Sequence, residues 1–212
     1  MGLAVAIRAL LSRSSPRAAA VAVATGPLVL LLSTPAAAGP VPGVATAPEA
    51  ATAAPRAAVA GPHCALGAGD GAKLHCFATF RAAVSFATGG RVTTAPATPA
   101  EAVKDPAFTA AVESVTAGSV LVGIEYADLN FGGASLSMYA GGRCDASSDA
   151  DYRFPSMPAG WNDRVSSFRS YSNCAQQLFN STNFGGALTG VITSLSYVGS
   201  GANDRASSMT FN

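Results

Sequence analysis

The pattern of apolar and polar residues changes near residue 118 and divides the chain into two parts. Beyond this point, every second residue of the first segment is apolar, which is typical of a β-strand with one buried face. These residues are Val120, Val122, Ile124 and Tyr126. Short apolar segments separated by Gly- and Ser-rich turns follow to the C-terminus. Residues 118–212 are therefore predicted to form an all-β sandwich with Greek-key connections.

Residues 63–117 have a helical pattern instead. Apolar residues recur every three or four positions over residues 77–88, and Gly89-Gly90 would end that helix. Thr98-Pro99-Ala100-Glu101 has the form of a capping box, and Asp105-Pro106 can begin another helical turn. We therefore expect a small, partly helical segment that precedes the sandwich.

The first 62 residues have the composition of a targeting segment and a linker. Three arginines precede an apolar run that is interrupted at Gly26-Pro27, and Ala36-Ala37-Ala38 supplies small residues for cleavage. This pattern predicts a secretory signal peptide over residues 1–38 rather than a membrane anchor. Residues 39–62 are rich in Ala and Pro and are predicted to be a disordered linker. The mature protein is expected to be secreted and to have no membrane span.

The chain has four cysteines, an even number that predicts two disulfide bonds in an exported protein. Three pairings are possible. We favour Cys64 with Cys76, before the sandwich, and Cys144 with Cys174, inside it. In the first pair each cysteine directly follows a histidine, which makes a zinc site the alternative. Adjacent residues rarely point at one ion, so the disulfide is the preferred interpretation.

Two motifs occur twice within residues 118–212. The hexapeptide Asn-Asp-Arg-x-Ser-Ser occupies residues 162–167 and again 203–208, and each copy follows an aromatic–glycine pattern. The aromatic–glycine patterns are Tyr126-x4-Phe131-x-Gly133 and Phe179-x4-Phe184-x-Gly186. The first copy is longer, and its additional residues are expected in the connection 143–161. An oxygen-rich loop that is repeated on a repeated scaffold indicates two related sites for a hard cation such as calcium.

Together these motifs resemble those of the βγ-crystallin superfamily, over about residues 120–212. The aromatic–glycine pattern is similar to the hairpin signature of that family, in which the first aromatic packs beneath a tightly folded hairpin. The hexapeptide is similar to the family's calcium-binding loop at every defined position. The resemblance implies a two-motif Greek-key sandwich, with motif one over residues 118–171 and motif two over residues 172–212.

The resemblance also implies two calcium ions, each with ligands from both loops. One ion would be held by Asp163 and, from the other loop, by Ser207. The second would be held by Asp204 and Ser166. The other expected contributors are the backbone carbonyls of Arg164, Arg205, Ala127 and Asn180. Asn162 and Asn203 are expected mainly to shape the loops, and either could also contribute an oxygen. Since each site has one assured carboxylate, we expect a modest affinity that is suited to extracellular calcium.

Several classes of function have no support in the sequence. The two histidines flank cysteines outside the repeats, so neither a Ser-His-Asp nor a Cys-His arrangement is visible, and we do not expect an enzyme. The formal net charge of +1 would become −2 without residues 1–38. Because the chain also lacks a Lys/Arg cluster, we do not expect nucleic acid as a partner.

We therefore expect a secreted, calcium-binding βγ-crystallin-like protein whose two ions stiffen the fold. Two alternatives with the same fold stay open. One is an extracellular metalloproteinase inhibitor that presents the connection 143–161 to a protease. The other is a killer-toxin-like or cell-wall-associated protein. The two intact hexapeptides favour the calcium-binding interpretation.

Overall fold

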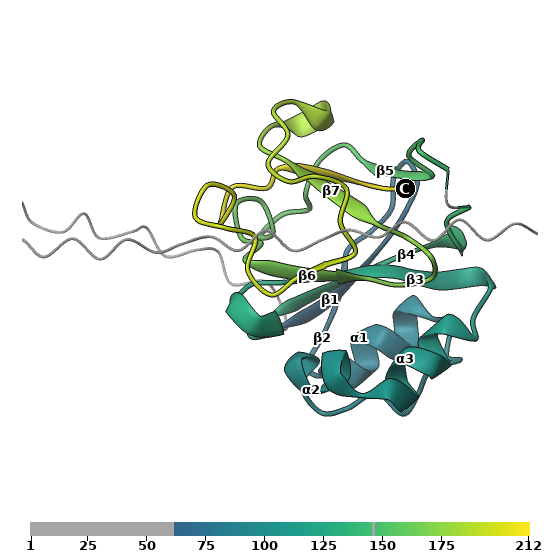
Figure 1. Ribbon diagram of the computed structural model, residues 1–212. Helices are drawn as coiled ribbons and strands as arrows, with labels where there is room; N and C mark the ends of the chain where they lie inside the picture. Colours follow the sequence, from purple (N-terminus) through teal and green to yellow (C-terminus); the bar gives the residue numbers. More distant parts are fainter. Residues whose placement is uncertain (1–61, 146) are drawn as a thin grey trace, which may run out of the picture. The chain divides into compact units, whose positions relative to one another are not determined.

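Two packed β-sheets, with a layer of helices over the outer face of the larger sheet, make up the structure (Figure 1). It is a computed structural model that describes residues 62–145 and 147–212. The predicted signal peptide, and the predicted linker except for Pro62, lie outside the described residues. Within the described ranges, none of the helices is both long and apolar enough to cross a membrane.

The larger sheet has the strand order β2-β1-β4-β3-β6-β8, and the smaller sheet has the order β5-β9-β7. The apolar core of the sandwich lies between them and includes Val122, Phe168, Leu178 and Phe211. The strands of the sandwich are β3 (Ala117–Tyr126), β4 (Ser135–Gly142), β5 (Tyr152–Phe154), β6 (Ser167–Ser170), β7 (Gln176–Phe179), β8 (Ser194–Leu195) and β9 (Ser208–Phe211).

The two sequence motifs exchange strands. Strand β5 belongs to motif one but pairs with β9 of motif two, whereas β8 belongs to motif two but pairs with β6 of motif one. Each sheet thus contains strands from both halves of the repeat. This connectivity confirms the predicted Greek-key sandwich. It also ties the connection 143–161 to the smaller sheet through β5, so that only part of the connection is a loop.

The segment before the sandwich, for which the sequence predicts two or three short helices, contains α1 (Phe80–Ala87), α2 (Pro99–Lys104) and α3 (Pro106–Glu113). The capping box at Thr98 and Glu101 is present, and Asp105 caps the helix that begins at Pro106. The helices cover the outer face of the larger sheet, where Phe80, Val84, Phe108 and Val112 share a core with Leu121, Ile124 and Tyr126.

Two short strands in this segment were not predicted. Strand β1 (His63–Gly67) runs parallel to β4, and β2 (His75–Phe77) pairs with β1, so the larger sheet continues into residues 63–77. The boundary predicted between residues 117 and 118 therefore divides one sheet and one compact unit. The sequence gives little sign of these strands because they are short and β1 directly follows Pro62, at the end of the Ala- and Pro-rich segment.

Strand β3 also differs from its prediction. Residues Val120 to Tyr126 are all buried, rather than every second one, because helices cover one face and the smaller sheet covers the other. A register shift between Leu121 and Gly123 interrupts the alternation. As a result, Val122 faces the sandwich core, whereas Ile124 and Tyr126 face the helices.

Both predicted disulfides are present. Cys64 and Cys76 are bonded with an S–S distance of 2.07 Å, and Cys144 and Cys174 with 2.00 Å. The first bond joins β1 to β2, where the two cysteines are direct partners in the ladder. Because both sulfurs of this pair are in a disulfide, the zinc alternative has no thiolate ligands.

Candidate metal centre

The two aromatic–glycine hairpins have nearly the same conformation. The ring centroids of Tyr126 and Phe131 lie 5.5 Å apart, and those of Phe179 and Phe184 lie 5.7 Å apart, both edge to face. The final glycine of each pattern has a positive φ, 73° at Gly133 and 65° at Gly186. The glycine is needed because side chains rarely adopt this backbone conformation.

The two Asn-Asp loops are also alike. Asp163 and Asp204 both adopt the left-handed conformation, with φ of 54° and 56°. In each loop the asparagine side chain donates a hydrogen bond to Oδ2 of the next aspartate, at 2.7 Å from Asn162 and 3.0 Å from Asn203. The asparagines therefore orient the aspartates, in line with the shaping role expected of them.

Hydrogen bonds between the loops bring the two halves of the repeat together. The backbone N–H of Asp163 donates to the carbonyl of Ala206, and that of Asp204 donates to the carbonyl of Val165, both at 3.1 Å. The acceptors directly precede Ser207 and Ser166. Each aspartate therefore contacts the residue that precedes the serine of the opposite loop. The resemblance to the βγ-crystallins implies this pairing of the loops.

A second set of bonds attaches the loops to the hairpins. The N–H of Ser166 donates to the carbonyl of Tyr126 at 2.9 Å, and the N–H of Ser207 donates to the carbonyl of Phe179 at 2.8 Å. These bonds bring Ala127 close to Ser166 and Asn180 close to Ser207. The following serines are structural, as expected, since Ser167 and Ser208 each donate to a hairpin carbonyl at 2.6 Å.

The half of the arrangement that contains Asp204 opens onto a cavity of about 450 Å³. The predicted residues Ala127, Ser166, Asn203 and Asp204 all line this cavity. Asn203 Oδ1 is buried and has no hydrogen-bond partner among the described residues. A buried carbonyl oxygen without a partner is costly, so this oxygen favours a cation or a donor in the cavity.

Three further residues, which the sequence did not suggest, line the same cavity: Asp128, Leu129 and Tyr197. Asp128 directly follows Ala127, whose carbonyl was expected to contribute, so its position in the repeat was a usable signal. Tyr197 comes from the turn before the second Asn-Asp loop. No pattern in the sequence indicates that it lies beside the first hairpin.

The two arginines of the loops hold their side chains against their own loops. Arg164 donates to the carbonyl of Gly160 at 3.3 Å, and its guanidinium carbon lies 5.2 Å from the Trp161 ring. Arg205 donates to the carbonyl of Gly201 at 2.7 Å. Their backbone carbonyls are the groups that the sequence assigns to the metal sites.

The donor set is made of oxygen atoms. Nowhere in residues 62–145 and 147–212 do three or more His, Cys, Asp or Glu residues lie together as a ligand cluster. The residues that converge offer carboxylate, amide, hydroxyl and backbone carbonyl oxygens. Such a set suits a hard cation such as calcium better than zinc, which prefers sulfur and nitrogen.

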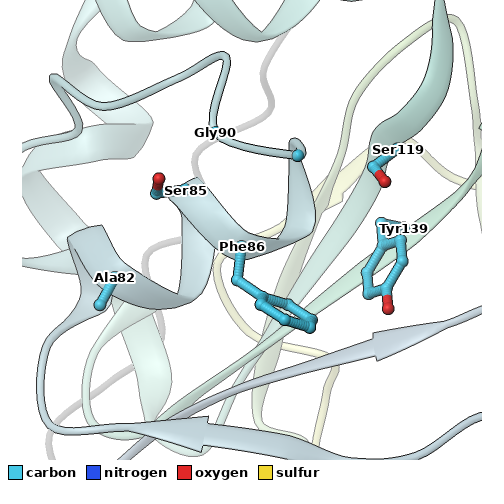
Figure 2. A pocket seen from close by; sticks show the side chains of 7 residues that line it. Ala82, Ser85, Phe86, Gly90, Ser119 and Tyr139 are labelled. Carbon is cyan, nitrogen blue, oxygen red and sulfur yellow. The ribbon is translucent and has the colours of Figure 1, made fainter.

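A separate hollow of about 570 Å³ lies beside the C-terminal end of α1. Figure 2 shows the Phe86 ring of α1 next to the Tyr139 ring of β4, and the two centroids are 6.0 Å apart. The rest of the lining consists of Ala82, Ser85, Gly89, Gly90 and Ser119. The polar side chains of this lining are the hydroxyls of Tyr139, Ser85 and Ser119.

No protein-family model and no curated protein matches the chain. Among solved structures, a βγ-crystallin domain from Clostridium beijerinckii is 23% identical, with a TM-score of 0.31 over 42% of this chain and 95% of that domain. A βγ-crystallin domain from Flavobacterium johnsoniae is 26% identical, with a TM-score of 0.31 over 43% and 93%. A double mutant of clostrillin in complex with nickel is 22% identical, with a TM-score of 0.32 over 42% and 95%.

The geometry of residues 118–212 defines the fold. Each half has an aromatic–glycine hairpin of the same conformation, and each gives one strand to the sheet of the other half. The two Asn-Asp loops exchange backbone hydrogen bonds in a matched way. Residues 118–212 therefore form the two-motif Greek-key sandwich that the resemblance to the βγ-crystallins implies.

Proposed function

We propose that the sandwich binds two calcium ions, one at each pairing of an aspartate with the serine of the opposite loop, and that the ions stiffen the fold. The observation that carries this proposal is the matched exchange of hydrogen bonds between Asp163 and Ala206 and between Asp204 and Val165. Because of this exchange, one cation can take oxygen ligands from both motifs. Binding would then join the two halves of the sandwich.

The residues fit calcium in kind. Asp163 and Asp204 supply the charge, and Ser207 and Ser166 supply hydroxyl oxygens from the opposite loops. The buried Oδ1 atom of Asn203 gains a partner when a cation is bound. Calcium itself supplies electrostatic attraction to several oxygens at once, with no demand for a strict geometry.

Calcium that binds only the folded protein stabilises it by mass action. At a free concentration of 100 times the dissociation constant, one site contributes about 2.7 kcal/mol. For a domain of this size, that free energy corresponds to a rise in the melting temperature of roughly 5–10 °C. This is a large fraction of the stability of a typical small domain.

Thermal unfolding of the full chain, in calcium and in chelator, tests the proposal. We expect the melting temperature to rise with calcium, and the double variant Asp163→Ala, Asp204→Ala to lose that rise. Asp70→Ala, in the turn between β1 and β2, is a matched control that should keep it. Equal melting temperatures for the wild type in calcium and in chelator would refute calcium binding.

We also propose that the protein acts outside the cell. Two disulfides are typical of an oxidising compartment, and the signal-peptide pattern over residues 1–38 supports export. When the chain is produced in a secreting host, mass spectrometry should find the protein in the medium with Gly39 as its first residue. Retention of the complete chain inside the cells would contradict this proposal.

A further inference from the structure

We propose that the two calcium sites are unequal, and that the carboxylate of Asp128 makes the site of Asp204 the tighter one. This inference rests on the proposed function and assigns a role to a residue outside the Asn-Asp loops. The site of Asp204 would fill first as calcium rises. The site of Asp163 would fill only at a higher concentration.

The repeat supplies an internal comparison for each residue of the site. Asp204 corresponds to Asp163, and Ser166 corresponds to Ser207. The second position after the first aromatic of each hairpin differs, since it is Asp128 in motif one and Ser181 in motif two. The two sites therefore share their main donors and differ by one carboxylate.

The backbones at the differing position match closely. The N–H of Asp128 donates to the carbonyl of Gly132 at 3.2 Å, and that of Ser181 donates to Gly185 at 3.0 Å. Their own carbonyls each accept a serine hydroxyl at 2.6 Å. The backbone is therefore equivalent at Asp128 and Ser181, and the two positions differ in the side chain alone.

The Asp128 carboxylate has a defined place beside the cavity. It packs over Gly133, where an added Cβ would overlap Oδ2 of the aspartate. Asp128 also lines the cavity that Asn203 and Asp204 line. Asn203, which also lines the cavity, has a buried Oδ1 without a hydrogen-bond partner among the described residues, and a cation next to this oxygen would satisfy it.

The charges near the two hairpins also favour the Asp204 site, because the hairpin of motif one adds a negative charge and the hairpin of motif two has a positive neighbour. Asp204 and Asp128 both line the cavity, so a cation bound there would have two acidic residues as neighbours. In motif two, the hairpin that carries Ser181 instead has a positive neighbour, since the guanidinium carbon of Arg153 lies 5.8 Å from the Phe184 ring centroid. One added negative charge at a short distance through partly hydrated protein strengthens binding of a divalent cation by roughly five- to tenfold.

The test separates the sites by variants and titrates each with calcium chloride in a calorimeter, on the full chain. Asp163→Asn leaves the Asp204 site, and Asp204→Asn leaves the Asp163 site. We expect the chain that keeps Asp204 to bind roughly five- to tenfold more tightly. Adding Asp128→Asn, which keeps the shape and removes the charge, should abolish this advantage. Adding Ser181→Asp to the Asp204→Asn chain should strengthen its weaker site.

Salt and folding controls make the result specific. An electrostatic advantage from Asp128 shrinks as ionic strength rises, whereas a purely structural role in the hairpin would not follow salt in this way. Circular dichroism checks that each variant keeps its fold. Equal affinities at the two sites, or an unchanged affinity after Asp128→Asn, would overturn the inference while leaving calcium binding in place. Absence of binding heat in the wild type would instead remove the proposed function and this inference with it.

Discussion

Motif one and motif two have matching hairpins and loops, but they differ in the length of their strands and in how far other parts of the chain cover those strands. In motif one, β3 and β4 have 10 and 8 residues, the helices cover β3, and β1 pairs with β4. In motif two, β7 and β8 have 4 and 2 residues, and Val191 and Tyr197 are half exposed.

The difference between the two motifs shows that loop conformation and strand length have different causes. Loop conformation follows the local sequence, because φ at Asp163 and Asp204 differs by only a few degrees despite the different surroundings. Strand length follows the neighbours, since a long strand needs partners and cover on both sides. We infer that motif two depends more than motif one on the strands that the two motifs exchange.

The largest expected effect is the loss of the core contact that holds motif two. Phe211 of β9 is fully buried, and its ring centroid lies 5.8 Å from that of Phe154 on the exchanged strand β5. Phe211→Ala should lower the free energy of unfolding by about 3–5 kcal/mol, measured by urea titration. Val191→Ala, at an exposed position of the same motif, should change it by less than about 0.5 kcal/mol. A small loss for Phe211→Ala would show that motif two does not depend on this contact.

The next effect concerns a polar bridge between the motifs. Glu125 of β3 is fully buried and accepts a hydrogen bond from Nε2 of Gln176 on β7 at 2.8 Å. Burial raises the pKa of Glu125 from 4.5 to about 8, and the hydrogen bond from Gln176 opposes that rise. The folded protein therefore keeps the proton over a range in which the unfolded chain releases it.

The free energy of unfolding is therefore expected to fall as the pH rises between the two pKa values of Glu125. The contribution of Glu125 to stability is complete below pH 4.5 and is lost as the pH rises to about 8. The slope in this range is at most about 1.4 kcal/mol per pH unit. Glu125→Gln should flatten this part of the curve of unfolding free energy against pH, whereas Glu101→Gln, at an exposed cap, should leave it. An unchanged curve for Glu125→Gln would mean that the carboxyl is not held neutral in the fold.

The smallest expected effect concerns the helices that cover motif one. Thr98 caps α2 through the capping box with Glu101. Thr98→Ala should lower the free energy of unfolding by about 1 kcal/mol, and thermal melting can detect this loss. Thr94→Ala, at an exposed position outside the helices, is the control. A change in the affinity of the proposed calcium sites with Thr98→Ala would contradict the independence of the Asn-Asp loops from the helices.

The sequence predicted the features that short motifs determine. The hairpins, the Asn-Asp loops, the capping box and both disulfides depend on a few residues with strong local preferences, and they are present. The pairing of Asp204 with Ser166 across the loops was predicted from the resemblance to βγ-crystallins. It agrees with the shared cavity that both residues line.

Features that depend on distant neighbours were not predictable in this way. A charged residue such as Glu125 within a strand is normally expected on an exposed face. The register shift in β3 and the cover from the smaller sheet bury it instead. Strand β1 pairs with a strand about 70 residues further along the chain, and nothing in its own five residues indicates that partner. The position of Asp128 beside Asp204 depends on the packing of the first hairpin against the second Asn-Asp loop, which residues distant in the sequence determine.

The strand that precedes the helices has a consequence for solubility. Without β1, strand β4 would present an open edge of eight residues, long enough to recruit another chain by β-pairing. Strand β1 occupies this edge, and the new outermost strand, β2, has only three residues and is fixed by a disulfide. Short edge strands are a common natural protection against aggregation. The hairpin of β1 and β2 therefore protects the long edge of β4 from pairing with another chain.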